Sequence, residues 1–320
     1  MTATPALGRA AATRTRTETL TTKRRSPLSR GDGRGAWLFL APFAIFYIAF
    51  LLGPTIWMLV SSFFNTSTVH KGLGSFAGFA NYGEMLTRSD FWSAMWHTLQ
   101  FTIYTTPPLV ILAFVFAILT NRIRRGQWFF RLAFFLPYIL PSATISLIWV
   151  FIFTPGTGLW ASAQQAVGIT PGAGMLAGPN TAMIGIAIAT VWWTLGFNFV
   201  LYLAGLQEIP RELYEAAAVD GASTWEQIRY VTLPLLQRTT TLVILLQIVA
   251  SLKIFDQVYL MTSGGPGIST QVALGLITNT GFTDDRIGAA SAASTLLLIL
   301  IVIIAVIRQI VDSRLARKDA

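Results

Sequence analysis

Long apolar stretches alternate with short polar segments along most of the chain. A bilayer span needs about 20 predominantly apolar residues in a row, and six stretches satisfy this length. They cover residues 36–63, 98–120, 128–153, 181–206, 239–261 and 289–307. Because a backbone surrounded by lipid must satisfy its own hydrogen bonds, each stretch is predicted to be helical. The pattern therefore predicts an all-α integral membrane protein with six transmembrane helices.

Prolines interrupt two of these stretches. Pro107 and Pro108 lie in the second stretch, and Pro137 and Pro141 lie in the third. A proline inside a helix removes a backbone donor and clashes with the turn before it, so we expect both helices to be irregular. Two interpretations stay open: a kink that packs against a neighbouring helix, or a bend that opens a cavity or acts as a hinge.

The composition agrees with a membrane environment. Of the 320 residues, 53% are hydrophobic and only 12% are charged, whereas a soluble domain carries about 25% charged residues. The chain has no cysteine, which excludes disulfides and a thiol nucleophile. The net charge of +9 arises mainly in short segments beside apolar stretches rather than on a basic face of a soluble core. Nucleic-acid binding is therefore not expected.

The Lys and Arg residues are divided unevenly among the connecting segments. With the N-terminus inside, nineteen of the 23 fall in cytoplasmic segments, and Lys253 falls within the fifth stretch. The remaining three, on the outside, are Lys71, Arg88 and Arg286. Cytoplasmic loops of membrane proteins carry an excess of basic residues. The distribution therefore predicts a multi-pass protein of a prokaryotic plasma membrane, with both termini in the cytoplasm.

The two ends of the chain are polar. Residues 1–34 are basic and hold too little apolar surface to fold, so we predict a disordered cytoplasmic tail there. Residues 35–311 form the predicted six-helix domain, and residues 312–320 form a second cytoplasmic tail. The first apolar stretch is too long for a signal peptide and more spans follow it, so cleavage is not expected.

The segment 207–238, between the fourth and fifth stretches, carries strong local signals for two short helices. Pro210 is expected in a first helical turn, and Gly221 suits the left-handed residue that ends a helix. Ser223 and Glu226 form a capping box that begins the second helix, which Pro234 is expected to stop.

The first of these two helices combines small and charged side chains. Small residues let another surface approach the backbone closely, so the helix suits the groove of a partner protein. An amphipathic helix lying on the membrane surface is the alternative, and the local pattern favours neither. Acidic Glu212 lies near the positive end of the helix dipole in both cases.

A spaced motif within this segment resembles a known family. Glu215-Ala216-Ala217 is followed by Asp220-Gly221-Ala222 and then by Val231-Thr232-Leu233-Pro234. This spacing is similar to the EAA loop of permease subunits of binding-protein-dependent ABC importers, with small departures at Ile228, Val231 and Arg238. In that family the loop is a coupling helix docked in a groove of a cytoplasmic ATPase. The resemblance implies that the contact residues are Glu215, Ala216, Ala217, Asp220, Gly221, Ala222, Leu233 and Pro234.

Further segments narrow the resemblance to carbohydrate-type permeases. Residues 202–210, 134–137 and 255–266 resemble the first of the two permeases in sugar and glycerol-3-phosphate importers, of the maltose-importer type. One departure is His97, where asparagine is common. The resemblance implies the type I importer arrangement of six helices and no cofactor. The implied partners are a cytoplasmic ATPase dimer, a second and different permease, an extracellular solute-binding protein and the lipid bilayer.

Spans four and five contain candidate substrate-path residues. Sugar sites combine aromatic faces with fixed polar groups, and the candidates are Trp192, Trp193, Asn198, Gln247, Ser251, Lys253 and Asp256. Charged side chains inside a bilayer are costly and point to function. Lys253 and Asp256 are nevertheless three residues apart on an expected helix, so they can also form a structural pair. Packing is likewise the alternative for the two tryptophans.

The chain lacks the motifs for powering transport or catalysis. It has no Gly-x-x-x-x-Gly-Lys-Ser/Thr loop for ATP phosphates, and its two histidines, His70 and His97, are not in a metal-ligand spacing. We therefore interpret it as a non-enzymatic permease that moves a carbohydrate into the cytoplasm while a partner hydrolyses ATP. The alternatives are an importer of another small solute, a secondary carrier, and a membrane glycosyltransferase using Asp284 and Asp285.

Overall fold

The chain folds into helices joined by loops. The computed structural model describes residues 33–69, 72–123, 125–170, 172 and 174–316. Within these ranges no β-strand forms, and one isolated antiparallel bridge joins Phe64 to Phe76. The chain divides into two units, Met1–Pro54 and Thr55–Ala320.

The first unit holds helix α1 (Gly33–Tyr47), the π-helical turn η1 (Ile48–Leu52) and the start of α2 (Gly53–Ser61). In the π turn the Gly53 N–H donates to the Ile48 carbonyl, five residues earlier. The next residue is Pro54, which has no N–H to donate. The wider turn therefore shifts the hydrogen-bond register just where a proline enters the helix.

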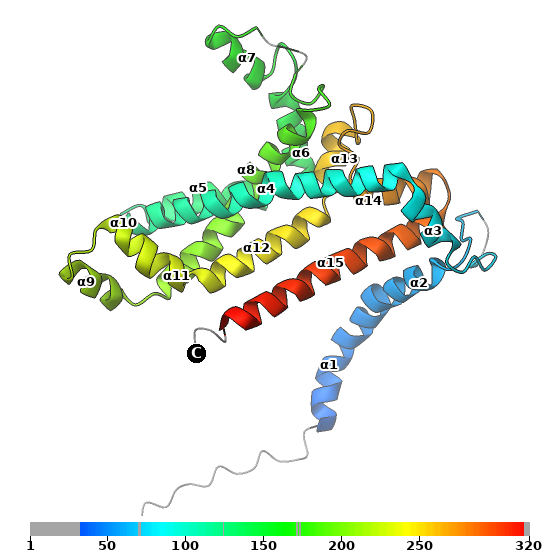
Figure 1. Ribbon diagram of the computed structural model, residues 1–320, viewed down its shortest axis with the longest axis horizontal. Helices are drawn as coiled ribbons and strands as arrows, with labels where there is room; N and C mark the ends of the chain where they lie inside the picture. Colours follow the sequence, from blue (N-terminus) through cyan, green and yellow to red (C-terminus); the bar gives the residue numbers. More distant parts are fainter. Residues whose placement is uncertain (1–32, 70–71, 124, 171, 173, 317–320) are drawn as a thin grey trace, which may run out of the picture. The chain divides into compact units, whose positions relative to one another are not determined.

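Helices of the second unit extend from Thr55, within α2, to residue 316 (Figure 1). The longer ones are α4 (Ser89–Arg122), α5 (Gln127–Ile139), α6 (Ser142–Ile152), α8 (Ala182–Gln207), α12 (Gln237–Leu252) and α15 (Ile287–Ala316). The shorter ones are α3 (Ala80–Thr87), α7 (Leu159–Ala166), α9 (Arg211–Val219), α10 (Thr224–Gln227), α11 (Leu233–Leu235), α13 (Asp256–Thr262) and α14 (Ala273–Thr278), with π turns η2 (Ile228–Thr232) and η3 (Asn279–Thr283).

Four segments in the described residues are long and apolar enough to cross a membrane unaided. They are Phe39–Ser61, α4, α8 and the Ile287–Ile310 part of α15. Two bent pairs raise the number to six when each pair counts as one span. These pairs are α5 with α6, bent by 97°, and Thr224–Leu235 with α12, bent by 65°. The all-helical, multi-span prediction is therefore confirmed, and two spans are broken.

The prolines act differently in the two predicted spans. The third span breaks at Leu140 and Pro141, where Leu140 is extended (φ −71°, ψ 142°), as expected for a residue before proline. The second span is not broken, because α4 is one helix of 34 residues that includes Pro107 and Pro108. One proline pair thus leaves its helix whole, while Pro141 turns the chain.

Close backbone approach holds α4, α5, α8 and α12 together (Figure 1). On α4, Ala113 and Ala117 are fully buried in this contact. On α8, a β-carbon added at Gly196 would lie 2.0 Å from the Phe134 carbonyl oxygen of α5. Small residues at such contacts are how helices pack tightly in membranes, where lipid gives helices little hydrophobic reason to associate.

A hydrogen-bonded cluster holds the end of the unit formed by α3, η3 and the start of α15. The Asp285 carboxylate accepts hydrogen bonds from the Ser67 and Thr68 hydroxyls and from the Thr68 N–H, the last at 2.7 Å. Arg286 forms an ion pair with Glu84 of α3. This argues against the glycosyltransferase alternative, in which Asp284 and Asp285 are catalytic, because the Asp285 carboxylate already joins two loops.

His97 has a defined partner on a loop far away in sequence. Its Nδ1 lies 3.1 Å from the carbonyl oxygen of Gln271, just before α14. A carbonyl only accepts hydrogen bonds, so Nδ1 carries the proton and donates it. His97 therefore links α4 to the loop before α14.

We predict that Gly196→Ala lowers the unfolding free energy by about 1–3 kcal/mol, because the added methyl forces α5 and α8 apart. The measurement is thermal unfolding of the detergent-solubilised chain. Gly83→Ala on α3 is the matched control, since its β-carbon meets open space, and its melting temperature should not fall. A Gly196→Ala variant as stable as the parent would contradict this packing argument.

The hydroxyls of Ser67 and Thr68, with the Thr68 N–H, lower the pKa of Asp285 from 3.8 to about 2. A carboxyl whose pKa is depressed on folding stabilises the fold above its unfolded pKa, and this contribution disappears as the pH falls through the folded value. We predict that the melting temperature falls more steeply between about pH 4 and pH 2 in the parent than in Asp285→Asn. Ser67→Ala should give an intermediate slope. Equal slopes in all three proteins would contradict the assignment.

Candidate functional site

The 207–238 segment forms the two short helices that its capping residues predict. Pro210 is the residue before α9, with an extended ψ of 135°, and Gly221 has the left-handed φ of +84°. The Ser223 side chain accepts from the Glu226 N–H while Glu226 accepts from the Ser223 N–H. The predictions for Gly221 and the capping box are confirmed, whereas Pro210 is the N-cap residue of α9, one position before the predicted first turn.

The predicted stop at Pro234 is wrong by a small margin. The helix that begins at Thr224 continues to Leu235, and the chain turns at Leu236. Within it the π turn η2 lets the Leu233 N–H donate to the Ile228 carbonyl. This shifted register accommodates Pro234, so the proline lies inside the last turn.

Helix α9 and its surroundings present side chains to the solvent-accessible surface. Glu215, Ala216, Asp220 and Gly221 are exposed, as are Leu233 and Pro234, while Ala217 and Ala222 are partly buried. The Tyr214 hydroxyl and the Thr232 hydroxyl, 2.9 Å apart, tie α9 to η2. Two exposed apolar side chains nearby, Val219 and Trp225, were not among the predicted contact residues.

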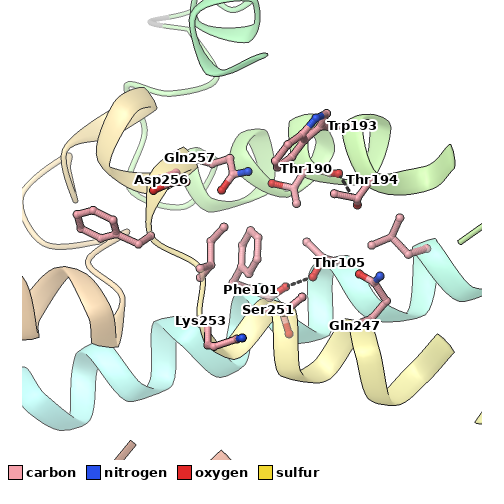
Figure 2. A pocket seen from close by; sticks show the side chains of 14 residues that line it. Phe101, Thr105, Thr190, Trp193, Thr194, Gln247, Ser251, Lys253, Asp256 and Gln257 are labelled. Carbon is pink, nitrogen blue, oxygen red and sulfur yellow. Dashed lines mark hydrogen bonds between the residues drawn. The ribbon is translucent and has the colours of Figure 1, made fainter. Parts of the chain in front are cut away.

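A cavity of about 220 Å³ lies between α4, α8, α12 and the start of α13. Figure 2 shows its lining side chains directed into this space. They are Phe101, Thr105 and Leu109 of α4, Thr190, Trp193 and Thr194 of α8, Gln247, Ala250 and Ser251 of α12, and Lys253, Ile254, Phe255, Asp256 and Gln257 at and beyond the end of α12.

Five of the seven predicted path residues line this cavity: Trp193, Gln247, Ser251, Lys253 and Asp256. The other two do not. Trp192 is half exposed and packs edge-on against Trp149, with ring centroids 5.9 Å apart. Asn198 is fully buried behind the cavity wall.

Lys253 and Asp256 do not form the predicted pair. The fifth stretch is not one helix, since α12 ends at Leu252 and α13 begins at Asp256. No ion pair within 4.0 Å joins these two residues, both of which the structure describes. Instead Asp256 accepts a hydrogen bond of 3.1 Å from the Ser142 hydroxyl, at the start of α6. The break between α5 and α6 and the break between α12 and α13 therefore meet at this contact.

Trp193 has a structural role in addition to lining the cavity. Its Nε1–H donates to the Leu140 carbonyl at 3.2 Å, where the α5–α6 break leaves a carbonyl without a helical partner. Beside it, Tyr138 stacks on Phe197 with ring centroids 5.2 Å apart. The direct-contact and packing interpretations of Trp193 are thus both consistent with its position.

A buried amide pair lies behind the cavity. The Gln247 Nε2 donates to the Asn198 Oδ1 at 2.8 Å, and the Asn198 Nδ2 donates to the Thr194 carbonyl at 3.2 Å. Sequence reasoning also missed Thr105, Thr190 and Thr194. Their signal was the spacing of threonines by three or four residues along α4 and α8, which places them on one helical face.

The described residues contain no group of three or more His, Asp or Glu that could hold a metal ion. His70 lies outside these residues, as do residues 1–32 and 317–320 of the two predicted tails. The site thus offers hydroxyls, amides, one ammonium, one carboxylate and aromatic rings, which suit binding of a polar solute.

Comparison with known families decides the class of protein. Residues 71–317 match the family described as "Binding-protein-dependent transport system inner membrane component". The chain belongs to this family. It is therefore a multi-pass inner-membrane permease component and not an enzyme, and the predicted resemblance to this family is confirmed.

Two relatives match along most of their length. The sulfoquinovosyl glycerol transport system permease protein SmoG of Agrobacterium fabrum is 35% identical, over 83% of this chain and 86% of its own. The trehalose/maltose transport system permease protein MalF of Thermococcus litoralis is 30% identical, over 83% and 90%. A crystal structure of a bacterial alginate ABC transporter, bound to an alginate pentasaccharide-bound periplasmic protein, has a TM-score of 0.78 at 20% identity, covering 88% of this chain and 95% of that chain. This confirms the expected type I fold.

We predict that Asn198→Leu destabilises the chain by about 1–3 kcal/mol, because the buried Gln247 amide loses its acceptor. Removing both partners should cost less than the sum of the single changes, since no unpaired group then remains. The measurement is a double-mutant cycle of Asn198→Leu and Gln247→Leu by thermal unfolding. Strict additivity would contradict a direct bond between the two amides.

Proposed function

We propose that this chain is a membrane subunit of an ABC importer that moves a carbohydrate into the cytoplasm. The observation that carries the proposal is that α8 and α12 have two roles. They line a polar cavity, and the segment that joins them contains the exposed helix α9. Relatives named as permeases for sulfoquinovosyl glycerol, trehalose/maltose and glycerol 3-phosphate support this substrate class. The substrate is a mono- or oligosaccharide or glycerol 3-phosphate.

Helix α9 is the proposed contact with a cytoplasmic ATPase dimer. Its exposed Ala216 and its glycine end at Gly221 leave room for a second surface, while Glu215 supplies a charge for pairing. The exposed side chains of Val219 and Trp225 add apolar area beside it. An apolar patch rimmed by polar groups is typical of a protein–protein contact.

The cavity is the proposed substrate path. The partly exposed ring of Trp193 offers an apolar face, and the surrounding hydroxyl and amide groups offer hydrogen bonds. A binding cleft with apolar walls and a few placed polar groups is the usual form of a small-molecule site. The proposed partners are a second, different permease, which completes the path, and an extracellular solute-binding protein, which delivers the sugar.

The proposed orientation has both termini in the cytoplasm. Nineteen of the 23 Lys and Arg residues then lie on the cytoplasmic side, in agreement with the positive-inside rule. In this orientation α9 faces the cytoplasm, where ATP is available, and α3 and η3 face outward.

Purification of the intact chain from its native membrane, with mass spectrometry of associated proteins, tests the assembly. We expect an ATPase, a second permease and a solute-binding protein to copurify, and ATP-driven sugar uptake from the reconstituted complex. Isolation of the chain alone, with uptake driven by sodium ions or protons, would instead identify a secondary carrier.

We predict that Glu215→Ala combined with Gly221→Asp abolishes ATP-driven uptake while the amount of protein in the membrane stays unchanged. Both residues are exposed, so the changes leave the buried core intact while they remove the Glu215 charge and fill a close approach. Aspartate at the left-handed φ of Gly221 adds strain only at the end of α9. The measurement is uptake into proteoliposomes normalised to protein content. Glu208→Ala, a loss of the same charge just before α9, is the matched control and should retain uptake. Normal uptake by the double variant would refute the coupling role.

A further inference from the structure

We infer that the cavity presents mainly hydrogen-bond acceptors and that its substrate is an uncharged, polyhydroxylated saccharide. The inference narrows the proposed substrate class, because it excludes phosphorylated, sulfonated and carboxylated ligands, glycerol 3-phosphate among them. The inference rests on the proposed function, because it concerns the ligand of the same cavity. Its basis is the direction of each hydrogen bond in the cavity wall.

The hydroxyl protons of the wall are already committed to the helices. Thr105, Thr190 and Thr194 each donate at 2.8 Å to the carbonyl four residues earlier. The Ser251 proton lies between the Thr102 hydroxyl and the Ile248 carbonyl, both at 2.9 Å. A hydroxyl has one proton and two lone pairs, so each of these groups has only lone pairs left for a ligand. Turning one to donate would break its bond to the helix.

The buried Asn198 fixes the orientation of the Gln247 amide, so that Nε2 faces Asn198. The Thr194 carbonyl only accepts, so it must face the Asn198 Nδ2, which leaves the Asn198 Oδ1 as an acceptor. The Gln247 Nε2 fills that acceptor at 2.8 Å. The Gln247 Oε1, an acceptor, and the second hydrogen of its Nε2, a donor, are then left for the cavity. Asn198 is thus a positioning residue, which orients the amide without lining the cavity.

Few donors remain in the wall. The indole N–H of Trp193 is bound to the Leu140 carbonyl. Lys253 and Gln257 supply donors, and the carboxylate of Asp256 lies among the same lining residues. The lining therefore holds one positive and one negative charge, so an anionic ligand would bring an uncompensated charge into a membrane site.

A neutral sugar complements this wall. Its hydroxyls donate to the lone pairs of the threonines, Ser251 and Gln247, and accept from Lys253 and Gln257. The C–H face of a sugar ring fits the partly exposed Trp193 ring. An anionic group accepts hydrogen bonds only, so most of this wall would face it with lone pairs.

The test is saturation-transfer NMR on the assembled importer in lipid nanodiscs, without the solute-binding protein, so that the membrane site alone selects. The neutral probes are maltose, trehalose and arabinobiose, and the anionic probes are glycerol 3-phosphate, glucuronate and glucose 6-phosphate. We expect transfer to at least one neutral probe and none to the anionic set. Thr190→Val with Thr194→Val should weaken the binding roughly tenfold, since two acceptors are lost without a change of shape. Thr295→Val is the matched control, because this buried threonine of α15 makes the same 2.8 Å bond to its helix away from the cavity.

Transfer to the anionic probes equal to that of the neutral ones would overturn the inference. So would binding that the double threonine variant leaves unchanged. No transfer to any probe, in a preparation that imports sugar with ATP, would contradict this cavity as the site while leaving the importer function standing. Failure of ATP-driven uptake itself would contradict the proposed function instead.

Discussion

Backbone hydrogen bonding is the constraint on which the described fold depends. An apolar surrounding offers no water to an open N–H or carbonyl, so a helix can break only where protein groups replace the missing bonds. At the break before Pro141, the Trp193 indole supplies a donor to the Leu140 carbonyl. At the break after Leu252, the Lys253 and Ile254 N–H groups donate back to the last turn of α12. Each break is therefore repaired by its own surroundings.

The two breaks also create the candidate site. The Ser142 hydroxyl at the start of α6 meets the Asp256 carboxylate at the start of α13, so both interrupted spans converge beside the cavity. The polar groups of the α12–α13 connection enter the cavity because the helix does not continue through them. An unbroken fifth span would instead have placed Lys253 and Asp256 on one helical face.

The cavity and the 207–238 loop are mechanically connected. Helix α8 carries Thr190, Trp193 and Thr194 and ends at Gln207, directly before the loop, and α12 begins directly after it and carries Gln247 and Ser251. The helices on either side of the loop therefore each supply part of the cavity wall. Helix α8 also packs closely on α5, with Gly196 against the α5 backbone.

Structural features that depend on residues close together in the chain follow from the sequence alone. Hydropathy located the spans, and the capping box at Ser223 and the left-handed Gly221 followed from side chains within a few residues. The sequence also indicated α8 and α12, two of the helices that line the cavity, because their polar residues stand out within apolar stretches. Only the tertiary structure decided which side chains face the cavity. Trp192 and Asn198 turn away, and the threonines of α4 and α8 face inward, because facing depends on contacts between helices distant in the chain. The break at residues 253–255 carries no proline or glycine, so no local signal marks it.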